Sequence, residues 1–288
     1  MQDIPKLGEI LEFRVDNKRT LRYLKAGSGE PLVLLHTIRT QLDYFQEVIP
    51  MLSQNYTVYA IDLPGHGYSS IEKEADYDEP YFRSAVVSFI EKLNLENVTL
   101  AGESIGAVIA LTVASQLPDR IKAIISSNPY DYEKRYGDGL RRGNLFANFV
   151  IGNFAIPLHG AIFAALENKL FLGLILRGGL KTKNWMPNDL LTKFNNAGKR
   201  KGFRYVERST FAGWRSWAQA TERYVAVKAP VILVYGENDW STPIERKRTS
   251  EALKVQPIIL ENTGHFAFVD SPGKLVAIVI STKNNQQV

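Results

Sequence analysis

Short β-rich runs alternate with helix-like stretches through the first part of the chain, and turn residues separate them. This change of period, from two residues to between three and four, is typical of an α/β sheet. Connections of this length favour parallel pairing of the strands. The pattern predicts strands at 9–15, 19–25, 32–36, 57–62, 98–101 and 121–126, and helices at 43–53, 80–93 and 105–116.

The pattern changes from about residue 132, where aromatic clusters and helix-compatible stretches replace the clear strand-like runs. Breaks at Gly152, Pro157 and Gly198 separate these stretches. We therefore expect a helical insertion, or cap, over 132–221, which divides a core domain into 1–131 and 222–288. In the second part the rhythm resumes, with predicted strands at 231–235 and 257–260 and predicted helices at 244–253 and 273–281.

The composition is that of a folded globular protein, with 288 residues of which 45% are apolar and 23% charged. The chain has no cysteine, which excludes disulfides, thiolate metal sites and a cysteine nucleophile. The first residues lack the basic and apolar regions of a signal peptide, so a cytoplasmic location is expected.

The 35 basic and 30 acidic residues leave an excess too small to indicate a nucleic-acid partner in a chain of this length. The excess is concentrated in 181–215, which holds nine basic residues and two acidic ones. Such a run usually forms a solvated face of the molecule.

A Gly-x-Ser-x-Gly motif at Gly102–Gly106 stands between the apolar strand 98–101 and a predicted helix. A serine nucleophile on a sharp strand-to-helix turn needs flanking glycines, because a Cβ there would clash. The motif alone is weak evidence, but its position at a strand-to-helix junction indicates that Ser104 is a nucleophile.

A serine hydroxyl needs a general base and an acid that orients the base. Two residues follow late predicted strands and therefore reach the carboxyl edge of the sheet: Asp239 after 231–235, and His265 after 257–260. Asp131, which follows strand 121–126, is a competing acid. An N-capping role for Asp239 and a loop role for His265 are the structural alternatives.

Together, these features resemble the α/β-hydrolase superfamily, in the branch with a helical cap between the sixth and seventh main strands. The resemblance spans nearly the whole chain. It rests on five pieces in order, namely His-Thr-Ile-Arg at 36–39, Asp-Leu-Pro-Gly-His-Gly-Tyr-Ser at 62–69, the Gly102–Gly106 motif, Gly-Glu-Asn-Asp at 236–239, and Gly-His at 264–265. It implies a mostly parallel sheet of the eight-stranded type, flanked by helices.

The resemblance also implies an oxyanion hole made by the backbone N–H groups of Ile38 and Ile105. His36 and His66 match loop positions that are structural in the family, and His159 belongs to the cap. The positions beside these loops are the candidates for the substrate pocket: Thr37, Arg39, Glu103, Trp240 and Phe266. For Arg39, a solvent-facing loop role is favoured over binding an anionic substrate end.

One departure bears on the reaction, because Thr37 stands where most members carry glycine. Plant hydroxynitrile lyases show a similar pairing of His-Thr-Ile with Gly-Glu-Ser. They follow the catalytic histidine with a lysine that stabilises cyanide, whereas this chain has Phe266. Carbon–carbon bond hydrolases keep the serine and remain an alternative. A hydrolase-fold receptor with little turnover is another, although a complete triad disfavours it.

We therefore expect a serine hydrolase of a carboxylic ester or similar acyl compound, with Ser104 as nucleophile, His265 as base and Asp239 as acid. This chemistry needs no metal and no organic cofactor. The uncharged segment 143–166 is long enough to cross a bilayer, but a crossing would separate Ser104 from His265. It is instead expected to form part of the cap, lining the pocket or resting on a lipid surface, with an ordinary buried cap core as the alternative. The sequence leaves the oligomeric state open.

Overall fold

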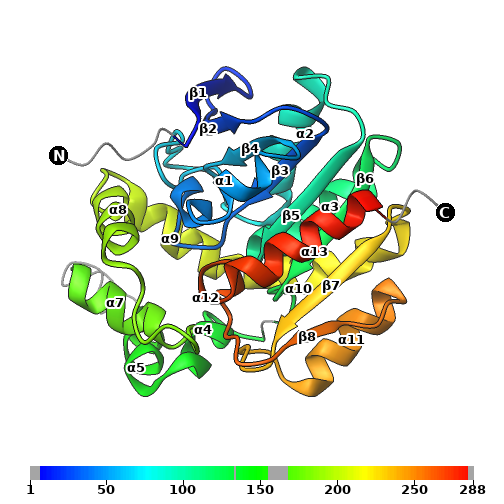
Figure 1. Cartoon of the computed structure of the whole chain (residues 1–288). Coiled ribbons are helices and arrows are strands. Elements are labelled where there is room, and N and C mark those ends of the chain that lie inside the picture. Colours follow the sequence, from blue (N-terminus) through cyan, green and yellow to red (C-terminus); the bar gives the residue numbers. More distant parts are fainter. Residues whose placement is uncertain (1–6, 133, 155–167, 285–288) are drawn as a thin grey trace.

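The computed structural model describes residues 7–132, 134–154 and 168–284, and these form an eight-stranded sheet flanked by helices (Figure 1). The strand order is β1-β2-β4-β3-β5-β6-β7-β8. β2 pairs antiparallel with β1 and with β4, and all the other pairs are parallel. The predicted mostly parallel α/β sheet is confirmed.

The central strands are short apolar runs buried on both faces, as expected where helices cover a parallel sheet from both sides. β5, for example, is buried at every residue. The strands are β1 (Glu9–Arg14), β2 (Thr20–Ala26), β3 (Pro31–Leu35), β4 (Thr57–Ile61), β5 (Val98–Glu103), β6 (Ile121–Ser127), β7 (Val231–Gly236) and β8 (Ile258–Leu260).

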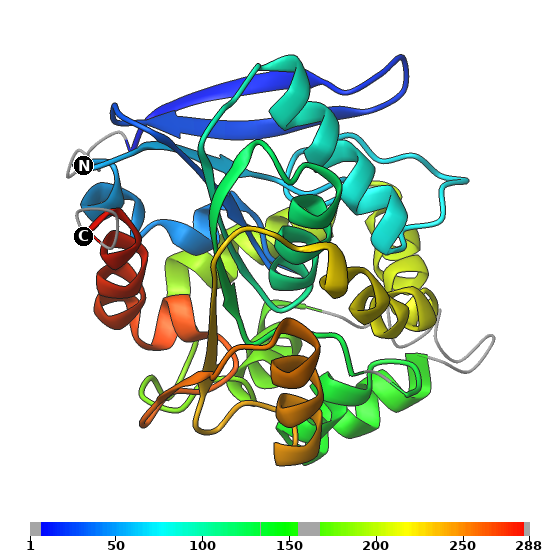
Figure 2. The same cartoon turned by 90° about the vertical axis from the view of Figure 1, so that its right-hand side faces the viewer.

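Helices cover both faces of the sheet, with α1 and α13 on one side and α2, α3 and α11 on the other (Figure 2). In the core these elements are η1 (Leu42–Phe45), α1 (Ile49–Leu52), α2 (Glu79–Lys92), α3 (Ile105–Gln116), α11 (Pro243–Leu253), α12 (Ala267–Asp270) and α13 (Pro272–Asn284). α3 is buried on all sides from Ile105 to Ala114, because it lies between the sheet and a later 3-10 segment, η2 (Ala220–Ala226).

The single helix predicted over 43–53 is wrong. The structure has a 3-10 turn at Leu42–Phe45 and a separate one-turn helix at Ile49–Leu52. Pro50 explains the break, because inside a continuous helix its ring would clash with the carbonyl four residues earlier. In the first turn of a new helix, where it lies here, proline is tolerated.

Between β6 and β7 the described residues contain helices and no strand, and most of these helices lie at the left of Figure 1. These elements are α4 (Asp138–Gly143), α5 (Leu145–Phe154), α7 (Lys169–Arg177), α8 (Asn188–Gly198), α9 (Phe203–Ala212), α10 (Trp214–Gln219) and η2 (Ala220–Ala226). We call this region the inserted helices. The division into core and cap at 132 and 221 stays a prediction.

The N-terminus of α2 generates a stability prediction. The Asp78 carboxylate accepts a hydrogen bond from the Tyr81 N–H at 3.0 Å, and Pro80 lies in the first turn. Replacing Asp78 with alanine removes this cap and should lower the free energy of unfolding by about 1 kcal/mol. Chemical denaturation measures the change. The exposed Asp76, changed to alanine, is the matched control and should leave stability unaltered within about 0.5 kcal/mol.

Candidate active site

Ser104 lies at the turn between β5, which ends at Glu103, and α3, which begins at Ile105. Its backbone has φ 59° and ψ −119°, a conformation that residues other than glycine rarely adopt. Such strain persists only where the surrounding structure imposes it, and it clusters at functional sites. The turn is the sharp strand-to-helix connection that the Gly-x-Ser-x-Gly motif predicts.

The two glycines of the motif leave no room for side chains. A Cβ on Gly102 would lie 2.2 Å from the Gly106 carbonyl oxygen, and a Cβ on Gly106 would lie 2.1 Å from that of Leu35 in β3. The helix and the two strands therefore approach each other as closely as backbone allows.

Asp239 and His265 meet across the ends of β7 and β8. His265 Nδ1 and Asp239 Oδ1 are 2.5 Å apart, and both side chains are fully buried. Asp239 Oδ2 accepts hydrogen bonds from the Ser241 N–H and hydroxyl. Burial opposes ionisation of this carboxyl, but His265 and the Ser241 donors outweigh it and hold the pKa of Asp239 below its usual value.

The other ring nitrogen, Nε2 of His265, is buried without a hydrogen-bond partner among the described residues. Tyr130 connects this ring to the serine turn: its N–H donates to the Ser104 carbonyl at 3.2 Å, and its ring centroid lies 6.2 Å from that of His265. Through Tyr130, an imidazole nitrogen that no described residue engages is linked to the strained serine turn.

Glu103, a candidate for the pocket, is completely buried and its carboxylate is occupied by the protein. It accepts from the Tyr44 and Ser127 hydroxyls, and from the N–H groups of Ala267 and Phe268 just after His265. Burial raises the pKa of Glu103 above its usual value. These contacts tie the histidine loop to the serine turn.

Asn128 was not singled out from the sequence, yet it joins three loops of the site. Its amide nitrogen donates to the carbonyls of Gly264 and His265, and its oxygen accepts from the Gly236 N–H at 2.8 Å. Its φ of 47° is a left-handed conformation that asparagine tolerates better than most residues. The only signal in the sequence was an asparagine directly after a buried strand.

The loop after β3 places Thr37, Ile38 and Arg39 in the interior. The Thr37 hydroxyl is buried without a hydrogen-bond partner among the described residues. Arg39 is only 4% exposed and forms a buried ion pair with Glu207 of α9. The solvent-facing role expected for Arg39 is therefore wrong: its charge instead connects the loop to the inserted helices.

Trp240 and Phe266 both contact the His265 ring. The Trp240 ring is stacked on the imidazole, with the centroids 3.7 Å apart and the planes inclined by 14°. The Phe266 ring lies edge-on to the imidazole, with the two ring centroids 5.4 Å apart. Both side chains are nearly inaccessible to solvent.

The competing acid, Asp131, does not contact His265. Its carboxylate accepts from the Thr249 hydroxyl of α11 and from the Tyr224 hydroxyl of η2. Burial, only partly offset by these donors, raises the pKa of Asp131 to about 6. In this geometry Asp239 is the carboxylate that orients the imidazole.

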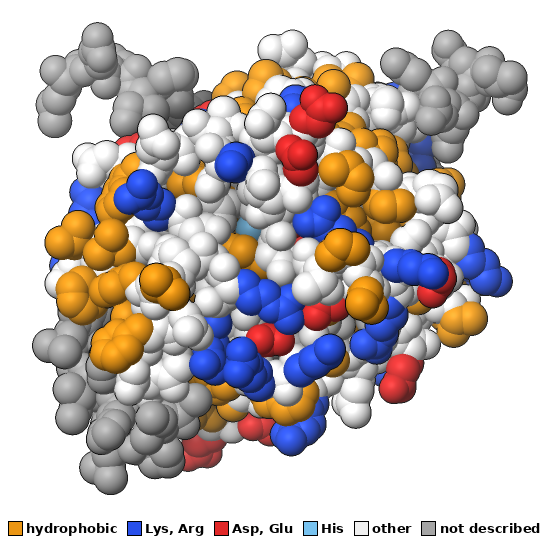
Figure 3. Space-filling view, turned by 90° about the horizontal axis from the view of Figure 1, so that it is seen from below, with side chains coloured by type: hydrophobic (Ala, Val, Ile, Leu, Met, Phe, Trp, Pro, Cys, Tyr) orange, Lys and Arg blue, Asp and Glu red, His pale blue; other side chains and the backbone are white. Residues whose placement is uncertain are grey.

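The segment expected to line the pocket or rest on lipid is described only up to Phe154. His159 and the remainder of 143–166 lie outside the described residues. Within the parts that are described, no helix combines the length and the apolar character needed to cross a bilayer. Exposed apolar side chains lie on α5 and α7, including Leu145 and Leu170. Apolar side chains gather on the left side of the face in Figure 3.

The model of the α/β-hydrolase fold family matches residues 30–272. The chain therefore belongs to the α/β-hydrolase fold family.

Relatives of similar length are named as hydrolases. The chain is 24% identical over 274 residues to an (E)-2-((N-methylformamido)methylene)succinate hydrolase of Acinetobacter baylyi, covering 91% of this chain and 94% of the relative. It is 23% identical over 260 residues to a pimeloyl-[acyl-carrier protein] methyl ester esterase of Aeromonas hydrophila, covering 88% and 95%. The solved enol-lactonase of Burkholderia xenovorans LB400 has a TM-score of 0.72 at 16% identity, covering 94% of this chain and 99% of that structure. These relatives support an α/β-hydrolase enzyme.

The raised pKa of Asp131 generates a prediction for pH. Its carboxyl has a pKa near 3.9 when unfolded and about 6 here, so it binds its proton more tightly in the folded chain. The contribution of Asp131 to the free energy of unfolding is therefore fully present below about pH 4. It is lost as the pH rises through about 6, which lowers the free energy of unfolding by about 3 kcal/mol. In Asp131→Asn this dependence should vanish, so the variant gains stability relative to wild type across that window.

Denaturation curves of Asp131→Asn and wild type, measured between pH 4 and 8, test this difference. The exposed Asp76→Asn serves as the control and should parallel wild type. Parallel stability curves for Asp131→Asn and wild type would show that Asp131 titrates normally.

Proposed function

We propose that this protein is a serine hydrolase that cleaves a carboxylic ester or a similar acyl compound through an acyl-enzyme. The observation that supports this most directly is the buried Asp239–His265 pair, which leaves His265 Nε2 without a hydrogen-bond partner in the described part of the chain. A nucleophile must be within reach of that nitrogen, and Ser104 on its strained turn is the candidate.

In this mechanism the Ser104 hydroxyl attacks the acyl carbon while His265 Nε2 takes its proton. Asp239 holds the proton on Nδ1, which fixes the tautomer and stabilises the imidazolium as it forms. His265 then gives the proton to the leaving alcohol. Water repeats the sequence on the acyl-enzyme, with His265 again as base, and releases the acid.

The negative charge that develops on the acyl oxygen needs donors. Ile105 begins α3, where first-turn N–H groups have no partner inside the helix, and Ile38 follows Thr37 in the loop after β3. The proposed oxyanion hole consists of these two N–H groups. One such donor is worth about 3 kcal/mol in comparable sites.

Two features bear on what the site accepts. The buried Thr37 hydroxyl, which no described residue engages, favours a polar group on the substrate nearby, because an unsatisfied buried hydroxyl is costly. The Arg39 charge is engaged by Glu207, which disfavours Arg39 as the receptor of an anionic substrate end. Contact of the segment 143–166 with a lipid surface stays a prediction.

Replacement of the proposed triad tests the mechanism. Ser104→Ala and His265→Ala should reduce turnover of an activated ester such as p-nitrophenyl acetate by at least about a thousandfold, and Asp239→Asn should reduce it severely. Ser126→Ala is the matched control, since the hydroxyl of this buried serine has no hydrogen-bond partner among the described residues. Steady-state kinetics measure the turnover of each variant, and circular dichroism shows whether the variant is folded.

The mechanism is wrong if Ser104→Ala keeps wild-type activity. If Asp239→Asn keeps wild-type activity and Asp131→Asn is inactive, only the choice of Asp239 as the acid of the triad is wrong. A screen of acyl chain lengths, leaving groups and carbon–carbon substrates then identifies the bond that is cleaved. Stoichiometric binding of a ligand without turnover would favour a receptor.

The lyase alternative is tested with a cyanohydrin. Ester hydrolysis should be the faster reaction, because the residue after His265 is the buried Phe266, which supplies no positive charge for a departing cyanide. Cyanide release from mandelonitrile is measured beside ester hydrolysis in wild type and in Thr37→Gly. Rapid cyanide release that disappears in Thr37→Gly would reverse the ranking.

A further inference from the structure

A short stretch after α7 lies against the loops that hold Asp239 and His265. The Gly178 carbonyl accepts a hydrogen bond from the Trp240 indole N–H at 2.9 Å. The next carbonyl, that of Gly179, accepts from the Phe266 N–H at 3.0 Å. We call residues 178–183 the strap. The strap belongs to the inserted helices, yet it accepts hydrogen bonds from Trp240 and Phe266, the residues that directly follow Asp239 and His265.

The other half of the strap is held by one carboxylate. Asp270, only 4% exposed, accepts from the N–H groups of Lys181, Thr182 and Lys183, each at 2.8 Å, and from the Gly264 N–H at 2.9 Å. Hydrogen bonds to a buried carboxylate are among the stronger ones in proteins. The strap and the histidine loop are therefore joined as one unit.

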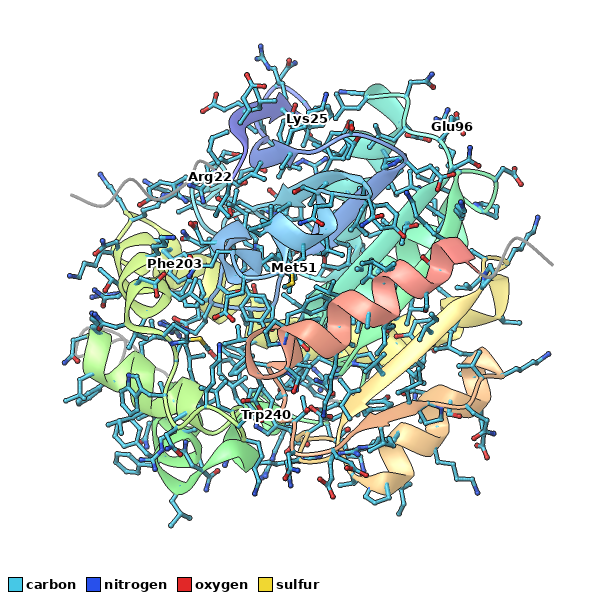
Figure 4. The ribbon with its side chains drawn as sticks, viewed as in Figure 1. Arg22, Lys25, Met51, Glu96, Phe203 and Trp240 are labelled. Carbon is cyan, nitrogen blue, oxygen red and sulfur yellow. The ribbon has the colours of Figure 1, made fainter. Side chains whose placement is uncertain are left out.

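Trp240 fills the space between the strap and the imidazole. Its indole is held at one edge by the Gly178 carbonyl and lies flat on the His265 ring, with the centroids 3.7 Å apart. Figure 4 shows Trp240 where the inserted helices meet the end of the sheet. A Cβ on Gly179 would lie 2.4 Å from the Phe266 ring and 2.9 Å from the Trp240 ring. The strap therefore packs against both rings with no room for a side chain at Gly179.

The single hydrogen bond that His265 donates to Asp239 restrains only the Nδ1 side of the imidazole, and the ring can still tilt about it. A flat, anchored surface against the ring face removes that freedom. Catalysis depends on such restraint, because a displacement of about 1 Å at the reacting atoms can cost about a hundredfold in rate.

We propose that the strap positions the general base: Gly178 holds Trp240 flat against His265, and Trp240 keeps Nε2 directed at the Ser104 hydroxyl. Trp240 is then a positioning residue of the triad, and part of the inserted helices supports the chemistry itself. This inference rests on the proposed function.

Four variants test the inference through the separation of kcat from KM. Trp240→Leu removes the ring, and Gly179→Ala displaces the strap. Each should lower kcat for an activated ester by about tenfold to a hundredfold and leave KM within about twofold. Trp240→Phe keeps an aromatic face and should recover much of the kcat lost in Trp240→Leu. Gly198→Ala is the matched glycine control, since its Cβ would come no closer than 3.8 Å to another residue.

A second measurement isolates the nucleophilic step. The rate constant for phosphonylation of Ser104 by a fluorophosphonate should fall in Trp240→Leu and Gly179→Ala in parallel with kcat. Trp214→Leu, in α10, controls for loss of a tryptophan and should match wild type. If Trp240→Leu fails to fold, the kcat values of Trp240→Phe and Gly179→Ala test the inference in its place.

The inference is overturned if Trp240→Leu and Gly179→Ala keep wild-type kcat, or if KM rises while kcat stays constant, which would make Trp240 a wall of the substrate pocket. In either case an inactive Ser104→Ala leaves the proposed function intact. An active Ser104→Ala instead removes the proposed function, and the strap then has no general base to position.

Discussion

The close approach of β3, β5 and α3 at the serine turn is the constraint on which the rest of the site depends. Gly106 packs against the Leu35 carbonyl, and Gly102 packs against the first turn of α3. This contact forces Ser104 into a backbone conformation that it would not adopt alone. Because the sheet is buried on both sides, the strain is held in place, and the serine is presented at the carboxyl edge where the other loops converge.

Buried polar groups then attach those loops to one another. Glu103 and Asn128 join the serine turn to the histidine loop, and Asp270 joins the histidine loop to the strap. Each buried polar group is costly unless its hydrogen bonds are made, so the network favours one arrangement of the loops over many. The Arg39–Glu207 pair extends this attachment from the loop after β3 to α9.

The inserted helices consequently do more than cover the ends of the strands. They touch the loop after β3 through Glu207, the loop after β7 through Gly178, and the loop after β8 through Gly179. The support of the general base that we propose therefore comes from the inserted helices.

The sequence by itself determined the alternation of strands and helices, the turn at Ser104 and the candidates Asp239 and His265. These follow from local periodicity, from glycine at a crowded turn, and from residues placed just after strands. The tertiary structure alone decided that Asp239 rather than Asp131 meets the imidazole, that Arg39 is buried against Glu207, and that Trp240 stacks on His265. Those outcomes depend on contacts between residues far apart in the chain, and no local pattern encodes which buried partner a charge or a ring will find.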